Sequence, residues 1–203
     1  MEKPEAQVYD ATAGNRVFYI EKDHPLILYG DIEPDLSFKP DAILDCRNTG
    51  LPDKSKHLII FDPPHDFGRT KNQGMYATPS KEVYDDKWPQ WKRPNALPRY
   101  YGIDKYKTKK ELKNFIYDAQ KEFYRILSDG GALFFKWSEN RVTLHDILKL
   151  FRNWSIILQI RAHQTGNMAT PTYWIMFMKS PTPNPQTELE ESINSKSKRS
   201  LHE

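Results

Sequence analysis

The first third of the chain alternates short apolar runs with polar, turn-forming segments. Runs of this length that few polar residues interrupt are typical of buried parallel strands. The predicted strands cover residues 7–10, 26–29, 42–44 and 58–61. Each of them closes on a carboxylate: Asp10, Asp31, Asp45 and Asp62. Because parallel strands end at the same edge of a sheet, we expect these side chains to form a row of hydrogen-bond acceptors there.

The second half of the chain combines helical and strand patterns. Apolar residues from Leu112 to Leu127 recur at steps of three and four, which predicts an amphipathic helix that begins near Thr108 and stops at the glycines of 129–131. The other predicted elements are a helix beginning at 17–22 after a small-residue turn, a fifth strand at 132–135, a helix at 142–151, and two closing strands at 155–162 and 173–178 that form a hairpin.

Residues 66–107 break this pattern, because strand and helix periodicity disappear while proline, glycine and asparagine recur. A loop of this length inside a compact domain is uncommon unless it is functional. Aromatic residues alternate with basic ones, which suits a phosphate backbone with stacked bases. The alternative is an insertion whose aromatic side chains pack onto the core. The candidate substrate-binding residues here are Trp88, Trp91, Lys92 and Arg93.

The whole pattern indicates one domain over residues 1–179, interrupted by the long insertion at 66–107. A chain of 203 residues is long enough to bury a core. Residues 180–203 are rich in proline, serine, lysine and glutamate, so we expect a disordered tail.

Composition narrows the possible partners. The net charge of +3 and the pI near 8.8 permit a nucleic-acid partner without requiring one. A single cysteine excludes a disulfide framework and a cysteine-rich zinc site, and the six histidines are scattered, so no metal is expected. There is no apolar stretch of membrane-spanning length and no signal-peptide pattern, so we expect a soluble, cytoplasmic protein. The oligomeric state is not indicated.

The segment Asp62-Pro63-Pro64-His65 directly follows the fourth predicted strand. Two prolines cannot donate to a sheet, so the strand ends with Asp62 at its carboxyl end, where ligands bind in open α/β sheets. Proline also fixes φ, so the Pro63 carbonyl has a set direction. This carbonyl and the Asp62 carboxylate are two acceptors suited to an amino group with two N–H donors, and His65 offers a flat stacking surface beside it.

Five segments together resemble class I S-adenosylmethionine-dependent methyltransferases, and more narrowly the small ones often encoded in phages and prophages. These segments are Asp10-Ala-Thr-Ala-Gly14, Gly30-Asp31-Ile32, Asp45-Cys-Arg47-Asn48, Asp62-Pro-Pro-His65 and Lys136-Trp137. The resemblance spans about residues 7–179. It implies an α/β, Rossmann-like class I methyltransferase fold, whose seven-stranded sheet is mostly parallel with a reversed last strand.

The resemblance also implies the site and its cofactor, S-adenosyl-L-methionine. The turn at 11–14 faces the methionine part, Asp31 takes the ribose hydroxyls, and Asp45 with Cys46 lies at the adenine. The cofactor-binding residues are then Asp10, Ala11, Thr12, Ala13, Gly14, Asp31, Ile32, Asp45, Cys46 and Arg47. The catalytic residues are Asp62, Pro63, Pro64, His65 and Lys136, of which Lys136 lies one strand from Asp62 or is simply a surface lysine.

The Asp-Pro-Pro segment resembles that of enzymes that methylate exocyclic amino groups of nucleic-acid bases, and this is the leading functional hypothesis. A ribose 2′-O-methyltransferase of RNA is an alternative, in which a lysine such as Lys136 activates a hydroxyl. A further alternative is a non-catalytic, methyltransferase-like subunit that only binds nucleic acid. DNA, RNA and small-molecule substrates all remain open.

Overall fold

The computed structural model describes residue 3 and residues 6–68, 105–162 and 170–179. In this part, seven strands form one sheet with the order β3-β2-β1-β4-β5-β7-β6. The strands are β1 (Val8–Asp10), β2 (Ile27–Asp31), β3 (Ala42–Ile43), β4 (Lys56–Phe61), β5 (Leu127–Ser138), β6 (Trp154–Arg161) and β7 (Thr172–Lys179). The helices are α2 (Lys109–Ile126) and α3 (Leu144–Leu148).

Strand direction agrees with the fold expected from the sequence. The adjacent strands among β1 to β5 pair in parallel with one another, whereas β7 runs antiparallel to both β5 and β6. The sheet is therefore mixed, with one reversed strand inserted between β5 and β6. This strand order and the reversed strand are those of the Rossmann-like class I methyltransferase fold, so the predicted fold class is confirmed.

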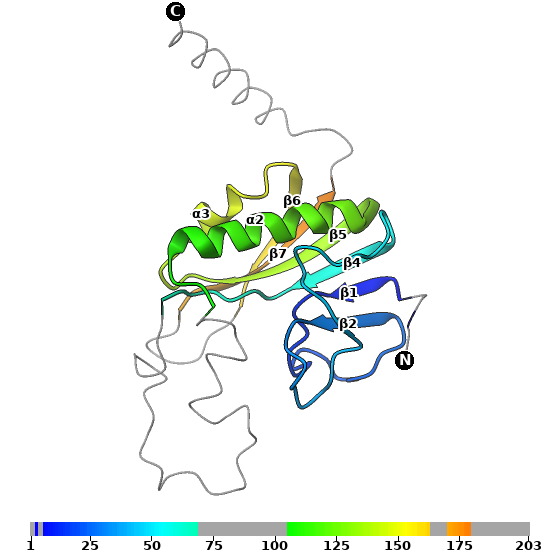
Figure 1. Ribbon diagram of the computed structural model, residues 1–203. Coiled ribbons are helices and arrows are strands. Elements are labelled where there is room, and N and C mark those ends of the chain that lie inside the picture. The colour runs from blue at the N-terminus through cyan, green and yellow to red at the C-terminus, as the bar shows by residue number, and fades with distance from the viewer. Residues whose placement is uncertain (1–2, 4–5, 69–104, 163–169, 180–203) are drawn as a thin grey trace, which may run out of the picture.

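Helix α2 covers one face of the sheet and runs alongside β5 in Figure 1. Its first turn is capped by Thr108, whose hydroxyl accepts a hydrogen bond from the Glu111 N–H. The buried face of the helix packs against Phe61 of β4, whose ring lies 4.8 Å from that of Phe123 and 6.1 Å from that of Phe115. The predicted amphipathic helix is thus present, and burial of its apolar face stabilises it.

Two expectations about local structure are wrong. The helix expected from 17–22 is a series of turns, because long-range contacts replace helical hydrogen bonds there. The Arg16 guanidinium donates to the carbonyls of Lys22 and Lys39, and Arg16 itself has a positive φ of 54°. The second error is the glycine stop of α2. The helix already ends at Ile126, and Gly130 lies inside β5 with a φ of 75°.

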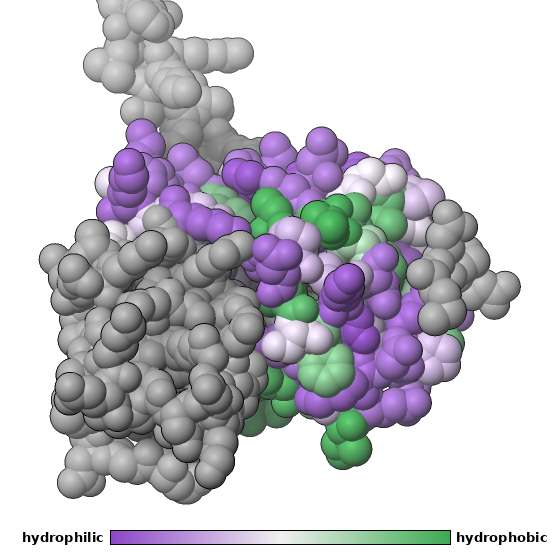
Figure 2. All heavy atoms as spheres, turned by 60° about the horizontal axis from the view of Figure 1, so that its bottom comes forward, coloured by the Kyte–Doolittle hydropathy of each residue, from purple (hydrophilic) through white to green (hydrophobic). Residues whose placement is uncertain are grey.

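The exposed large apolar side chains of the described chain belong mainly to two regions, the connections on either side of β2 and the strand β6. In the view of Figure 2, apolar side chains (green) lie in patches among polar ones (purple). None of the helices in the described residues has the length and apolar character needed to span a membrane.

Candidate active site

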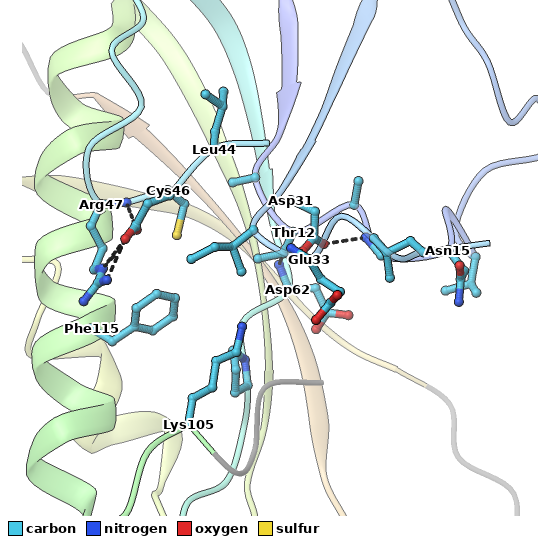
Figure 3. A pocket seen from close by; sticks show the side chains of 18 of the residues that line it. Thr12, Asn15, Asp31, Glu33, Leu44, Cys46, Arg47, Asp62, Lys105 and Phe115 are labelled. Carbon is cyan, nitrogen blue, oxygen red and sulfur yellow. Dashed lines mark hydrogen bonds and ion pairs between the residues drawn. The ribbon is translucent and has the colours of Figure 1, made fainter. Parts of the chain in front are cut away.

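A cavity of about 340 Å³ lies at the carboxyl ends of β1 to β4 (Figure 3). Its lining includes all of the predicted cofactor-binding residues except Asp10. These lining residues are Ala11, Thr12, Ala13, Gly14, Asp31, Ile32, Asp45, Cys46 and Arg47. The motif residues Asp62 and Pro64 line the same cavity. The structure therefore brings the segments singled out in the sequence to one place.

The small-residue turn after β1 is held from both neighbouring strands. Ala11 N–H donates to the Ile60 carbonyl of β4 at 2.9 Å, and Ala13 N–H donates to the Gly30 carbonyl of β2 at 3.0 Å. Gly14 has a φ of 50°, a conformation that glycine adopts at little cost. Since the side chains of this turn are small, a ligand in the cavity can approach its backbone closely.

Asp31 joins this turn to the end of β2. One of its carboxylate oxygens accepts a hydrogen bond from the Gly14 N–H at 2.9 Å, and the other accepts one from the Glu33 N–H at 2.9 Å. Burial raises the pKa of Asp31, and the nearby charge of Lys105 acts in the opposite direction. The two backbone bonds fix the carboxylate at the cavity wall, where its remaining lone pairs can accept bonds from hydroxyl groups.

The segment after β3 supplies a second carboxylate. The Arg47 guanidinium binds Asp45 through Nε at 2.9 Å and Nη2 at 2.6 Å, and this pairing holds the pKa of Asp45 below its usual range. Cys46 is buried beside them, and burial raises the pKa of its thiol, so the sulfur lines the cavity as an apolar group.

The remaining cavity walls are largely apolar and include residues that the sequence reading missed. Figure 3 shows Leu44 and Phe115 on the same side as Cys46, and the side chain of Lys105 directed into the cavity. Phe115 comes from α2 and Lys105 from the segment just before it, so neither belongs to a strand-end motif. The missed lining residues are Asn15, Val17, Phe18, Glu33, Leu36, Leu44, Lys105, Tyr106 and Phe115.

Asp62 is the residue around which the predicted catalytic residues gather. Its backbone N–H donates to the Thr12 hydroxyl at 2.8 Å, which ties the motif to the small-residue turn. Its Oδ2 accepts a hydrogen bond from Lys136 Nζ at 3.0 Å, and its Oδ1 lies 2.9 Å from His65 Nε2. Within the described chain, however, no donor is aligned on Oδ1 well enough to form a hydrogen bond. One buried carboxylate oxygen is thus left with an unused acceptor position.

The protonation state of Asp62 follows from its neighbours. Burial acts to raise its pKa, but the close contact with His65 and the charge and hydrogen bond of Lys136 outweigh burial, and the pKa lies below its ordinary value. Asp62 is therefore a carboxylate at neutral pH. A carboxylate of low pKa is a weak base, so its chemistry here is to accept hydrogen bonds and position a donor.

Two aromatic rings lie close to the ammonium group of Lys136. Lys136 Nζ lies 4.7 Å from the ring centroid of Phe18 and 5.9 Å from that of Trp174, and these two rings meet edge to face at 5.2 Å. On the other side of the motif, the His65 ring meets Trp137 at 5.2 Å and 89°. Lys136 thus contacts Asp62 directly, and the simple surface-lysine interpretation is wrong.

Asp10 lies behind the cavity wall, where it is almost completely buried. One of its oxygens accepts a hydrogen bond from the Thr12 N–H at 3.1 Å and the other accepts one from the Tyr19 hydroxyl at 2.7 Å. Burial raises the pKa of Asp10 to about 7, although these two hydrogen bonds act to lower it. Asp10 therefore anchors the turn at Thr12 and the segment that contains Tyr19 to the end of β1.

This burial gives a pH dependence of stability. The folded protein keeps Asp10 protonated up to about pH 7, whereas the unfolded chain releases that proton near pH 4. The contribution of Asp10 to the free energy of unfolding is therefore largest below about pH 4 and is lost as the pH rises to 7. We expect urea unfolding to show this decline in the wild type and a flatter profile in Asp10→Asn, the difference being a few kcal/mol. If the free energy of unfolding depended on pH in the same way in both proteins, Asp10 would not be the source of the decline.

The predicted substrate-binding residues Trp88, Trp91, Lys92 and Arg93 lie outside the described residues. The two described ends of this stretch are joined beside the site, because the Gly68 N–H donates to the Tyr106 carbonyl at 2.7 Å. The assignment of these residues to substrate binding, and of 180–203 to a tail, remains a prediction. In the described chain, no group of three or more histidine, cysteine, aspartate or glutamate side chains is placed to hold a metal ion.

The fold and the site thus define an α/β protein of the class I methyltransferase fold with a cavity at its strand ends. Comparisons of the sequence with protein-family models and with curated proteins find no match. Among solved structures, the chain is similar to a protein from Sulfolobus solfataricus that is provisionally assigned as a type 11 methyltransferase. The two share 15% sequence identity over 89% of this chain and 87% of the other, with a TM-score of 0.41. Similarity at this level does not assign an activity.

Proposed function

We propose that this protein is an S-adenosylmethionine-dependent methyltransferase that acts on an exocyclic amino group of a nucleic-acid base. The observation that carries the proposal is the placement of Asp62. Its carboxylate lines the same cavity as the predicted cofactor-binding residues, and its buried Oδ1 has no aligned hydrogen-bond donor among the described residues. A buried acceptor without a donor is costly unless a ligand satisfies it, and an amino N–H is such a donor.

The residues present fit the cofactor. Asp31 offers a fixed carboxylate for the ribose hydroxyls, and the apolar wall of Ile32, Leu44 and Cys46 suits the adenine ring. The backbone of 11–14 allows the close approach that the methionine part requires. When bound, S-adenosylmethionine supplies an activated methyl group on a positively charged sulfur. A cavity of about 340 Å³ falls within the size range of small-molecule sites.

The contribution of the chain to the reaction is positioning. Asp62 accepts one N–H of the target amino group, and the Pro63 carbonyl accepts the other, so the nitrogen lone pair points into the cavity. Lys136 and His65 keep Asp62 ionised and hold its carboxylate in one orientation. A duplex substrate must release its base from the stack to reach Asp62.

A nucleic acid is the substrate class favoured by residues 66–107. Basic residues outnumber acidic ones in that stretch, and its aromatic residues alternate with them. Its described ends are hydrogen-bonded to each other through Gly68 and Tyr106, and Tyr106 lines the same cavity as Asp62. The lysine and arginine residues of this sequence suit the phosphate groups that flank a target base.

The cofactor half of the proposal is tested by titration of the full chain with S-adenosylmethionine in a calorimeter. We expect saturable binding of one cofactor per chain. Absence of binding at millimolar cofactor would leave only the fold and would contradict the proposal.

A second candidate function is methylation of a hydroxyl group, such as a ribose 2′-OH. The placement of Lys136 beside Asp62 at the site is the observation that favours it, because this reaction uses a lysine as the base for a hydroxyl. The ion pair with Asp62 opposes it, because a protonated amine cannot accept the hydroxyl proton. The diproline has no evident role in that reaction. The leading proposal therefore remains amino-group methylation.

We expect His65→Phe to keep much of the transfer activity and His65→Ala to lose about tenfold more. The reason is that an amino-group enzyme uses position 65 as a flat surface, which phenylalanine retains and alanine does not. The measurement is the transfer rate of both variants on the same nucleic acid. Equal damage by the two substitutions would contradict a stacking role and would show that position 65 acts through the contact of its imidazole with Asp62.

A further inference from the structure

Strand β6 forms one edge of the sheet, and in the described residues no strand pairs with its outer side. After Trp154, every side chain of this strand is exposed. Four of them are large and aliphatic, with exposed fractions of 51, 54, 45 and 48% for Ile156, Ile157, Leu158 and Ile160. An edge strand of eight residues that presents such side chains is a template for pairing with another strand.

The sequence of β6 lacks most of the features by which proteins protect an exposed edge. It contains no proline, lysine or glycine, and its single charged residue, Arg161, is its last. Its only irregularity is a register shift between Ile156 and Leu158. The opposite edge of the sheet differs, because β3 is only two residues long.

The exposed edge continues onto the face of the sheet. Leu158 pairs with Met176 and Ile160 pairs with Trp174 across the β6–β7 ladder, and paired residues point to the same face. Trp174 in turn contacts Phe134 at 5.6 Å. The alternate residues of these strands, such as Ile175 and Phe177, are buried in the core with α2.

We propose that β6 is the interface of a homodimer, in which β6 pairs antiparallel with β6 of a second copy. Charge permits this occupant, because each β6 carries one charged residue at its end, and it favours this direction. A twofold axis at Leu158 sets Arg161 opposite Ser155 of the second copy, so the two guanidinium groups lie at opposite ends of the interface. A parallel pair would bring these like charges to the same end, which is unfavourable.

Geometry favours a closed dimer over a filament. Pairing β6 with itself uses the same surface on both copies and leaves no second long edge, because β3 offers only two residues to a further copy. The C-terminal segment of the same chain is a poor occupant. Residues 180–203 contain only three large aliphatic residues, and these are widely separated in the sequence: Leu189, Ile193 and Leu201.

The site stays accessible in this arrangement. β6 runs parallel to β5, since both are antiparallel to β7, so Arg161 lies at the edge of the sheet where the strand-end cavity opens. Antiparallel pairing of two β6 strands therefore turns the two cavities to opposite edges of a continuous sheet. The dimer is thus compatible with one independent site in each copy.

Sedimentation equilibrium of the full chain tests the proposal. We expect twice the 23.9 kDa mass of one chain for the wild type, and a weakening of the dimer by at least about tenfold in Ile157→Lys, because a lysine at the interface must lose its hydration. Ile43→Lys on β3 is the matched control, since it places the same charge at an exposed isoleucine of the other edge, and it should remain dimeric.

Circular dichroism establishes that each variant is folded, and Ile157→Ser replaces Ile157→Lys if the lysine prevents folding. The proposal is overturned if the wild type sediments as a monomer or as a larger polymer. It is also overturned if the folded Ile157 variant dimerises as tightly as the wild type, because the interface then lies elsewhere.

Discussion

Replacement of Asp62 by alanine is expected to reduce methyl transfer by about 100-fold or more while cofactor affinity stays nearly unchanged. Loss of the carboxylate removes the acceptor that orients the target amino group, and misplacement of a reacting group by about an ångström has effects of this size. The wall of the cavity survives the substitution, because residue 62 bonds to the Thr12 hydroxyl through its backbone N–H. Single-turnover transfer and cofactor titration measure the two quantities separately.

Asp62→Asn is the matched variant for this experiment. The amide keeps the shape and one acceptor oxygen but loses the charge that pairs with Lys136 and His65. We expect its activity to lie between those of the wild type and the alanine variant. If Asp62→Ala retains near wild-type turnover, Asp62 has no part in the reaction.

Replacement of Asp31 by alanine is expected to weaken cofactor binding by about 1–3 kcal/mol, which corresponds to roughly 5- to 150-fold in the dissociation constant. Hydrogen bonds from the ribose hydroxyls to a charged acceptor are lost, and the Gly14 N–H loses the partner that holds the small-residue turn. Calorimetric titration of the folded variant gives the affinity directly.

Asp129→Ala is a suitable control for Asp31→Ala. Asp129 is an exposed carboxylate that pairs with Lys54 and is not among the residues that line the cavity. We expect its cofactor affinity to equal that of the wild type. Equal affinity in the Asp31 variant as well would exclude Asp31 from the cofactor site and would leave the cavity without its expected ribose acceptor.

The strand ends were the most predictable part of this protein. An apolar run followed by an aspartate predicts both a strand and the edge of the sheet at which the aspartate lies. Asp31, Asp45 and Asp62 follow this rule, and all three line one cavity. Asp10 follows the same pattern, yet it is buried behind the wall. Its place is set by the Tyr19 hydroxyl, which lies in a segment without regular structure, and no sequence periodicity indicates such a contact.

The cavity residues that the sequence did not indicate come from elements whose hydrophobic pattern predicts only a role in core packing, or from segments without a regular pattern. Phe115 belongs to the apolar face of α2 and is indistinguishable in sequence from its core neighbours, although it also reaches the cavity. Phe18 and Trp174 meet beside Lys136 from segments more than 150 residues apart, so only the folded sheet brings them together. The helix expected at 17–22 fails for a similar reason, since the tertiary bonds of Arg16 decide the local backbone.

The most direct test of the proposed function is incubation of the full chain with S-adenosylmethionine labelled in its methyl group and with separate pools of DNA, RNA and protein. Asp62→Ala serves as the matched control. We expect label in a nucleic-acid pool with the wild type, recovered on the exocyclic nitrogen of a base, and almost none with the variant. Label in no pool, or equal label with the wild type and Asp62→Ala, would contradict the assignment of this site as the centre of methyl transfer to nucleic acid.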